Sequence, residues 1–195
     1  RGLGSLANIY FVRQKEQLGL GHAIYQARHH IGDEPFAVML GDELFVGQEP
    51  CVKQLMDVHE QYGGSVICVR EVPDEEVHRY GVIEPERIND RLCRALSLVE
   101  KPTLEQAPSN QAVAGRYILD ADIFGILSDL PPGRNGEIQL TDAIDILSKV
   151  KPVYTYEVEG QRYDVGEKLG YLQATVEFAL QRPDLAPAFR EFLIK

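Results

Sequence analysis

The sequence is poor in the residues that build disulfide, zinc or membrane-spanning structures. It has no tryptophan, two methionines and three cysteines among its 195 residues. Cys51, Cys68 and Cys93 are odd in number and form no CxxC pair, so neither a disulfide framework nor a zinc site is predicted. We expect buried, reduced thiols and a cytoplasmic protein. No apolar run approaches the roughly 20 residues of a membrane span, and no signal-peptide pattern is present.

Positive charge is also scarce. The sequence has 20 Lys and Arg against 30 Asp and Glu, which leaves a formal net charge of -10. Binding to nucleic acid or to a membrane surface requires a basic face, so we expect neither as a partner. A small phosphorylated substrate remains compatible with this charge, because it needs only a few local cations or a metal ion.

Short apolar runs alternate with segments of helical period, which predicts an α/β fold. We expect a mainly parallel mixed sheet flanked by helices, in a single domain over residues 1–195. Several short strands with polar turns in the middle of the chain predict a small added antiparallel layer. The predicted strands are residues 8–12, 36–40, 65–69, 94–100, 112–119 and 153–158. The predicted helices cover residues 21–31, 51–63, 138–149 and 169–180.

Two acids each follow a predicted strand and precede a helix or turn. Asp42 comes after the run 36–40, and Asp164 stands in "QRYDVGEKLG". Ligands of open α/β sheets bind at the carboxyl ends of the strands, so we expect both acids at one edge. A pair of carboxylates suits Mg²⁺, whose other ligands are phosphate oxygens and water. The alternative is that either acid caps a helix or lies in a solvated turn, which is the commoner role for a single acid.

Two further segments are candidates for substrate contact. Gly19 and Gly21 precede a helix, where glycine lets backbone approach a ligand closely, although an ordinary flexible helix entry is the alternative. This stretch is neither GxGxxG nor GxxxxGK[ST]. Glu100 and Lys101 end a strand before Pro102, and in an extended segment they point to opposite faces. They suit a sugar hydroxyl and a phosphate, or they form an ordinary surface pair.

Seven motifs occur together and carry a family resemblance. They are "VRQKEQLGLGHAI", "LGDELF", "RYGVIEP", "LVEKP", "AVAGRYIL", "GEIQLTDAI" and "YDVGEKLGYLQATVEFAL". In this order they resemble the bacterial UTP–glucose-1-phosphate uridylyltransferases (UDP-glucose pyrophosphorylases), a branch of the sugar-phosphate nucleotidylyltransferases. The resemblance covers essentially the whole chain. It implies a Rossmann-like nucleotide-diphospho-sugar transferase fold.

The resemblance also implies a site and a reaction. UMP passes from UTP to glucose 1-phosphate, with Mg²⁺ as cofactor, giving UDP-glucose and pyrophosphate. Asp42, Lys101 and Asp164 are implied to be catalytic. The resemblance implies that Gln14 and Gly19 contact uracil and that Gly81, Glu100 and Val113 line the glucose. It also implies that Lys101 meets the sugar phosphate and that Asp42 and Asp164 bind Mg²⁺. "LGDE" stands where many uridylyltransferases carry "PDD" or "ADD", which weakens the assignment of the base but not of the reaction.

Two alternatives remain open. Thymidylyl transfer to glucose 1-phosphate differs by one methyl group on the base, which is worth only about 1–3 kcal/mol in discrimination. A non-catalytic nucleotide-sugar-binding or assembly module is the alternative from another class. Its support is that the family's glycine-rich "GxGTR" loop does not occur in the sequence. We therefore expect an N-terminally truncated domain that is inactive alone, with an open sheet edge and a tendency to form a homo-oligomer.

Overall fold

Most of the predicted apolar runs form the strands of one mixed sheet. The computed structural model describes residues 5–194. The six-stranded sheet has the order β1-β6-β3-β7-β5-β4. Its strands are β1 (Phe36–Met39), β3 (Ser65–Glu71), β4 (Gly81–Arg87), β5 (Leu92–Glu100), β6 (Gln111–Leu119) and β7 (Val153–Glu157). The expected mixed sheet flanked by helices is confirmed.

The expected parallel majority is wrong for the strands that the structure describes. β3 and β7 pair in parallel, whereas β1–β6, β3–β6, β4–β5 and β5–β7 are antiparallel. Parallel pairing requires a crossover connection between the two paired strands. The sequence pattern shows helices between strands, but it does not show which strands become neighbours. Here β4 and β5 are joined by a short turn and form a hairpin.

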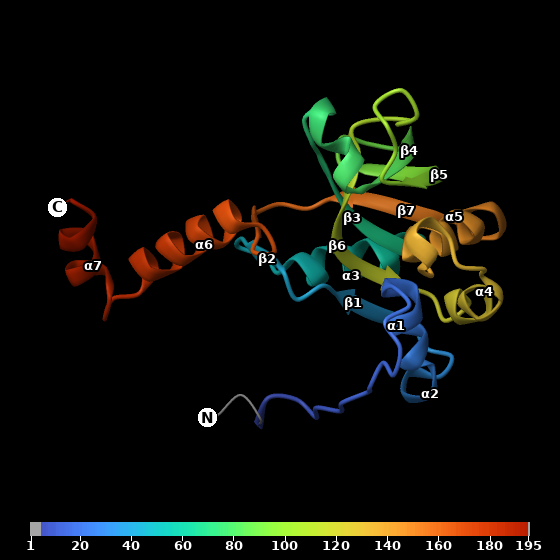
Figure 1. Cartoon of the computed structure of the whole chain (residues 1–195), viewed down its shortest axis with the longest axis horizontal. Helices are drawn as coiled ribbons and strands as arrows, with labels where there is room; N and C mark the ends of the chain where they lie inside the picture. The colour runs from blue at the N-terminus through green and yellow to red at the C-terminus, as the bar shows by residue number, and fades with distance from the viewer. Residues whose placement is uncertain (1–4, 195) are drawn as a thin grey trace.

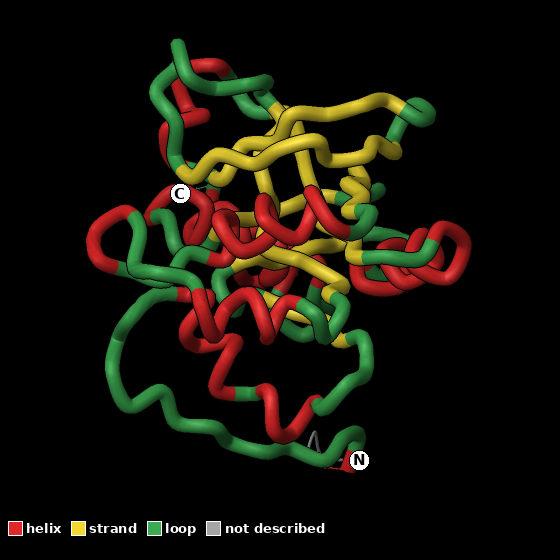
Figure 2. Tube along the Cα trace, turned by 90° about the vertical axis from the view of Figure 1, so that its right-hand side faces the viewer, coloured by secondary structure: helices red, strands yellow, loops and turns green. Residues whose placement is uncertain are grey.

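Helices cover both faces of the sheet (Figures 1 and 2). On one face, Ile67 and Val69 of β3 belong to the cluster that includes side chains of α1, α4 and α5. On the other face, Val66 and Cys68 pack with side chains of α3. Neighbouring residues of a strand point to opposite faces, so a strand covered on both sides reads as one continuous apolar run. The helices are α1 (Leu20–Gln26), α2 (Arg28–Ile31), α3 (Cys51–Tyr62), α4 (Ile123–Asp129) and α5 (Leu140–Val150), with 3₁₀ turns η2 (Asp74–Arg79) and η3 (Arg134–Gly136).

The predicted antiparallel layer is present at one side of the sheet. β4 and β5 pair over most of their length, and Val82 of β4 also pairs with Ala112 of β6. Val72 and Val77 join these two residues in a separate small core. In Figure 1 the layer stands at the top of the molecule.

The predicted strand at residues 8–12 is wrong. This segment is loop, drawn along the outside of the molecule in Figure 2, and Phe11 is 95% exposed. Residues of high strand propensity need a partner strand, and within residues 5–194 none pairs with this segment. As expected, β1 lies at an edge of the sheet and pairs with β6 alone among the described strands.

A second, two-stranded sheet joins β2 (Glu43–Val46) to β8 (Gln161–Asp164). From it, α6 (Lys168–Gln181) and α7 (Ala186–Leu193) extend away from the main body (Figure 1). The predicted apolar face of α6 is only partly covered, since Leu169 and Leu172 are 67% and 59% exposed. In the part of the chain described, no helix has the length and apolar character needed to cross a membrane.

Candidate functional site

The two predicted metal acids lie together, although not through the parallel edge that we expected. Asp42 directly precedes β2 and Asp164 ends β8, and the register pairs Glu43 with Asp164. Val165 N donates to Asp42 O at 2.8 Å. A Cβ placed on Gly166 would lie 3.1 Å from Asp42 Oδ2 and 3.2 Å from Asp164 Oδ1. Both carboxylates therefore face one small space beside Gly166.

These carboxylates match the preferences of Mg²⁺. In proteins this ion takes one or two carboxylates and keeps several waters or phosphate oxygens. Across residues 5–194, no three His, Cys, Asp or Glu side chains come close enough to form a complete protein cage. Two histidines have other partners: His22 contacts Gln14 and Gln26, and His59 contacts the Gly64 carbonyl. If these two carboxylates hold Mg²⁺, the other coordination positions are left to water or phosphate oxygens.

A buried ion pair beside the two acids was missed at the level of sequence. Arg162 contacts both carboxylate oxygens of Glu43 and lies 3.5 Å from Asp164 Oδ2. The side chains of Arg162 and Glu43 are 8% and 10% exposed. Burial raises the pKa of the Glu43 carboxyl, Arg162 opposes this, and Asp164 and Asp42 add to the rise. The sequence signal for this ion pair is weak: Glu43 stands next to Asp42 and precedes an apolar run.

A second arginine holds the backbone around Asp42. Arg116 on β6 donates to the carbonyl oxygens of Leu40 at 2.7 Å and Gly115 at 3.1 Å, and it also contacts Glu43 O. Gly115 has φ of 67°, and a Cβ there would lie 2.6 Å from Glu43 Cγ. Both the conformation and the close approach require glycine at this position of the "AVAGRYIL" motif.

The predicted sugar-side residues Gly81 and Glu100 face each other across β4 and β5. Thr141 of α5, which sequence reasoning missed, donates its hydroxyl to Glu100 Oε2 at 2.6 Å. A Cβ on Gly81 would lie 2.8 Å from Thr141 Oγ1 and 3.3 Å from Glu100 Oε2. The glycine thus leaves room for the oriented carboxylate.

The expectation that Glu100 and Lys101 point to opposite faces is wrong. Lys101 Nζ lies 3.7 Å from Glu100 Oε1. The reason is that Lys101 is not extended: its φ is 47°, and its N–H donates to Tyr80 O at 2.9 Å as β5 ends. Such a backbone conformation costs about 1–3 kcal/mol in a non-glycine residue and clusters at functional sites.

β6 contributes residues to both the predicted sugar side and the predicted metal side. Tyr117 is buried, and burial, followed by the negative charges of Glu100 and Glu43, raises the pKa of its hydroxyl. Val113, predicted to line the glucose, lies on the same strand opposite Val69 of β3. The register between β3 and β6 is irregular between Tyr117 and Val113, yet both side chains pack in the core cluster that includes Ile67.

The predicted uracil-side residues also come together. Gln14 Nε2 donates to Gly19 O at 3.1 Å. Gly19 has φ of 96°, and a Cβ there would lie 2.8 Å from Glu137 Cβ, while Gly21 N donates to Ile138 O at 2.9 Å. These glycines therefore allow close packing against the chain's own "GEIQLTDAI" segment. This role for Gly19 and Gly21 differs from both roles predicted from the sequence, a close approach to a ligand and a flexible helix entry.

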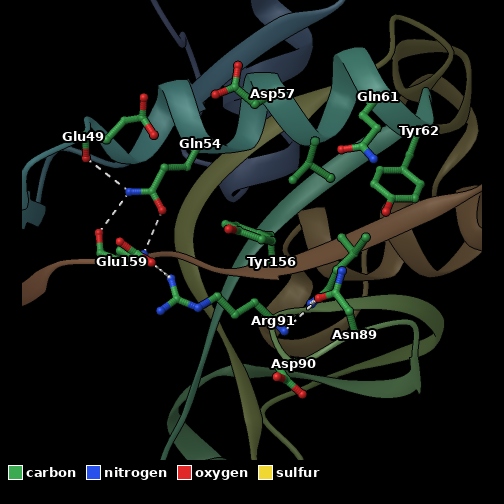
Figure 3. A pocket seen from close by; sticks show the side chains of 12 residues that line it. Glu49, Gln54, Asp57, Gln61, Tyr62, Asn89, Asp90, Arg91, Tyr156 and Glu159 are labelled. Atoms are coloured by element: carbon green, nitrogen blue, oxygen red, sulfur yellow. Dashed lines mark hydrogen bonds and ion pairs between the residues drawn. The ribbon is translucent and has the colours of Figure 1, made fainter.

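A cavity of about 540 Å³ lies between α3, the β4–β5 turn and the end of β7 (Figure 3), and it contains none of the predicted site residues. Two of its lining residues, Gln54 and Glu159, hold the backbone that leads into β8. Gln54 donates to the carbonyls of Glu49 at 3.1 Å and Glu159 at 3.0 Å, and Glu159 N donates to Gln54 Oε1 at 2.8 Å. This buried amide fixes the backbone just before the strand that carries Arg162 and Asp164.

Residues 3–181 match the nucleotidyl transferase family, and the chain belongs to that family. A UTP–glucose-1-phosphate uridylyltransferase of Staphylococcus epidermidis is 50% identical over 188 residues, which are 96% of this chain and 65% of the relative. The chain thus spans about two thirds of the length of that curated relative.

Solved structures agree with this family. A crystal structure of UDP-glucose pyrophosphorylase complexed with UDP-glucose superposes with a TM-score of 0.85 at 45% identity, covering 89% of this chain and 66% of that one. A UTP-bound UGPase from Acinetobacter baumannii gives a TM-score of 0.84 at 36% identity, covering 94% of this chain and 64% of that one. The Rossmann-like transferase fold that the motifs implied is confirmed.

Proposed function

We propose that this chain carries the metal and sugar side of a Mg²⁺-dependent uridylyltransferase that makes UDP-glucose and pyrophosphate from UTP and glucose 1-phosphate. The observation that carries the proposal is the shared space beside Gly166, which two carboxylates from residues far apart in sequence face. The match to the family and the names of the relatives support the same reaction.

The reaction is a single displacement. A phosphate oxygen of glucose 1-phosphate attacks the α-phosphorus of UTP, the new P–O bond forms, and pyrophosphate leaves with the electron pair of the broken bond. Positioning and charge neutralisation dominate such transfers, so no covalent enzyme intermediate is needed. Asp42 and Asp164 would hold Mg²⁺, which would supply neutralisation of the phosphate charge when bound.

The other predicted residues bind and orient the substrates. Lys101 neutralises the sugar phosphate, and Glu100, held by Thr141, accepts hydrogen bonds from sugar hydroxyls. Gly81 and Val113 line the glucose. Gln14 and Gly19, which are hydrogen-bonded to each other, contact the uracil.

The identity of the base is the finer part of the proposal. Thymine differs from uracil by one methyl group, a difference worth about 1–3 kcal/mol in a pocket. The relatives named above act on or bind uridine nucleotides, which favours UTP. We expect kcat/KM with UTP to exceed that with dTTP, and the reverse order would assign thymidylyl transfer.

The experiment is a pyrophosphate-release assay with UTP, glucose 1-phosphate and Mg²⁺. One arm uses the chain alone, for which we expect no turnover. The other joins it to the segment of the S. epidermidis relative that it does not cover, because the family's glycine-rich loop does not occur in these 195 residues. In the joined protein, Asp42→Asn and Asp164→Asn should each abolish most of kcat. The control Asp184→Asn changes an exposed acid paired with Arg182 and should be neutral.

Two results would contradict the proposal. If the joined protein binds UDP-glucose without any turnover, the chain belongs to a binding or assembly module instead. If Asp42→Asn and Asp164→Asn keep the parent kcat at saturating Mg²⁺, the two acids are not the metal site.

We also propose that the protein forms a homo-oligomer. The open edge of β1 and the exposed apolar side chains of α6 support self-association. Light scattering of the purified chain tests this, and a monomer at all accessible concentrations would contradict it.

A further inference from the structure

The element that brings the two metal acids together is small. β2 and β8 have four residues each and form a sheet of two strands only. An isolated pair of short strands is marginally stable in water. A site that must hold its ligands to within about 0.5 Å therefore needs support from side chains outside the ladder.

Arg162 gives this support from the β8 side. Its guanidinium contacts both carboxylate oxygens of Glu43 on β2 and lies 3.5 Å from Asp164 Oδ2. A planar fork matched to a carboxylate restricts orientation as well as distance. Because Arg162 takes both oxygens of Glu43, the acid next to Asp42 is held away from the space beside Gly166.

Arg116 gives support from the main sheet. It reaches from β6 to the carbonyl oxygens of Leu40 and Glu43, which stand on either side of Gly41 and Asp42. The backbone that presents Asp42 is therefore tied to the central sheet at both ends.

We propose that Arg162, acting through Glu43, and Arg116 are positioning residues that aim the carboxylates of Asp42 and Asp164 at one cation. The inference rests on the proposed function, since it concerns the metal site of that reaction. Neither arginine contacts the ion, and their effect is on the geometry of the two carboxylates.

If Arg162 and Glu43 only stabilised the fold, replacing both would leave metal affinity unchanged. The inference predicts a loss of metal affinity and is therefore testable. Replacing both members of a buried ion pair by apolar residues often leaves stability unchanged, whereas removing one member leaves a buried charge unpaired. Glu43→Leu together with Arg162→Met therefore removes the positioning contacts with little expected loss of Tm. Losing an outer partner of a metal ligand typically weakens metal affinity by about 10–100-fold.

The experiment measures Mn²⁺ binding to the 195-residue chain by electron paramagnetic resonance, with Tm recorded for each variant. The control is Arg182→Gln, because Arg182 also makes a two-point contact with a carboxylate, Asp184, but at the surface. We expect Mn²⁺ affinity at least tenfold below the parent in the double variant and parent-like affinity in the control.

Each outcome is decisive. Parent-like Mn²⁺ affinity in the double variant overturns the positioning role and leaves the proposed function intact. If the parent itself shows no Mn²⁺ binding that Asp42→Asn removes, the metal site of the proposed function fails, and this inference fails with it. If the double variant does not fold, Arg162→Lys decides. It keeps the charge that neutralises Glu43 but not the fork, so parent-like affinity in that variant overturns the inference.

Discussion

Replacing Gly166 by alanine tests the space that Asp42 and Asp164 share. Gly166 lies outside the left-handed region, so its backbone can accept a side chain. The new methyl group would lie 3.1 Å from Asp42 Oδ2 and 3.2 Å from Asp164 Oδ1. Ions of the size of Mg²⁺ bind oxygens at about 2.0–2.1 Å, so a methyl group against both oxygens displaces an ion or its waters from that side.

The expected effect on stability is small, whereas the expected effect on metal binding is large. Gly→Ala at a compatible position stabilises by about 0.4–1 kcal/mol through the unfolded chain, and the two tight contacts offset part of this gain. We therefore expect Tm within a few degrees of the parent. Mn²⁺ affinity should fall about tenfold or more, which corresponds to about 1.4 kcal/mol.

Titration of Mn²⁺ followed by electron paramagnetic resonance measures the affinity, and calorimetric unfolding of the same samples measures Tm. Gly41→Ala is the matched control, because it alters the residue next to Asp42, between β1 and β2, at a position where a Cβ meets nothing within 4 Å. Parent-like Mn²⁺ affinity in Gly166→Ala, with an intact fold, would show that the ion does not use this space and would refute the assignment.

Three further predictions concern the substrates and use the joined protein. Lys101→Gln should raise KM for glucose 1-phosphate and lower kcat. Lys101→Gly should have the same kinetic effects but a higher Tm, because glycine relieves the strain of the φ of 47°. Wild-type kinetics in these variants would make Lys101 an ordinary surface residue. Thr141→Val removes the donor to Glu100 and should lower the free energy of unfolding by about 1.5 kcal/mol and raise KM for glucose 1-phosphate but not UTP. Gly19→Ala places a Cβ 2.8 Å from Glu137 Cβ, so we expect a loss of stability above about 1 kcal/mol. It should also raise KM for UTP but not for glucose 1-phosphate. Equal effects on both KM values would count against a role of Gly19 in binding the base.

Local pattern was sufficient for most elements. The runs that became β3, β5, β6 and β7 are apolar enough to be buried, and α3 and α5 show the helical period over enough turns to be recognised. Residues 8–12 have the same composition but form loop, because a strand needs a partner and composition does not supply one. The turn of Lys101 toward Glu100 was likewise invisible, because it depends on one positive φ at the end of β5.

The class of fold, the family and the individual acids that are candidates for the metal site can all be predicted from the sequence alone. These follow from short-range information: period, composition and motif order. Three features depend on packing in three dimensions. They are the mostly antiparallel pairing of the described strands, the meeting of Asp42 and Asp164 through β2 and β8, and the contact of Arg162 with Glu43. Those two partners are 119 residues apart, and nothing within a local window specifies their contact. Their pairing is set by the register of two strands and by the cost of leaving a buried charge without a partner.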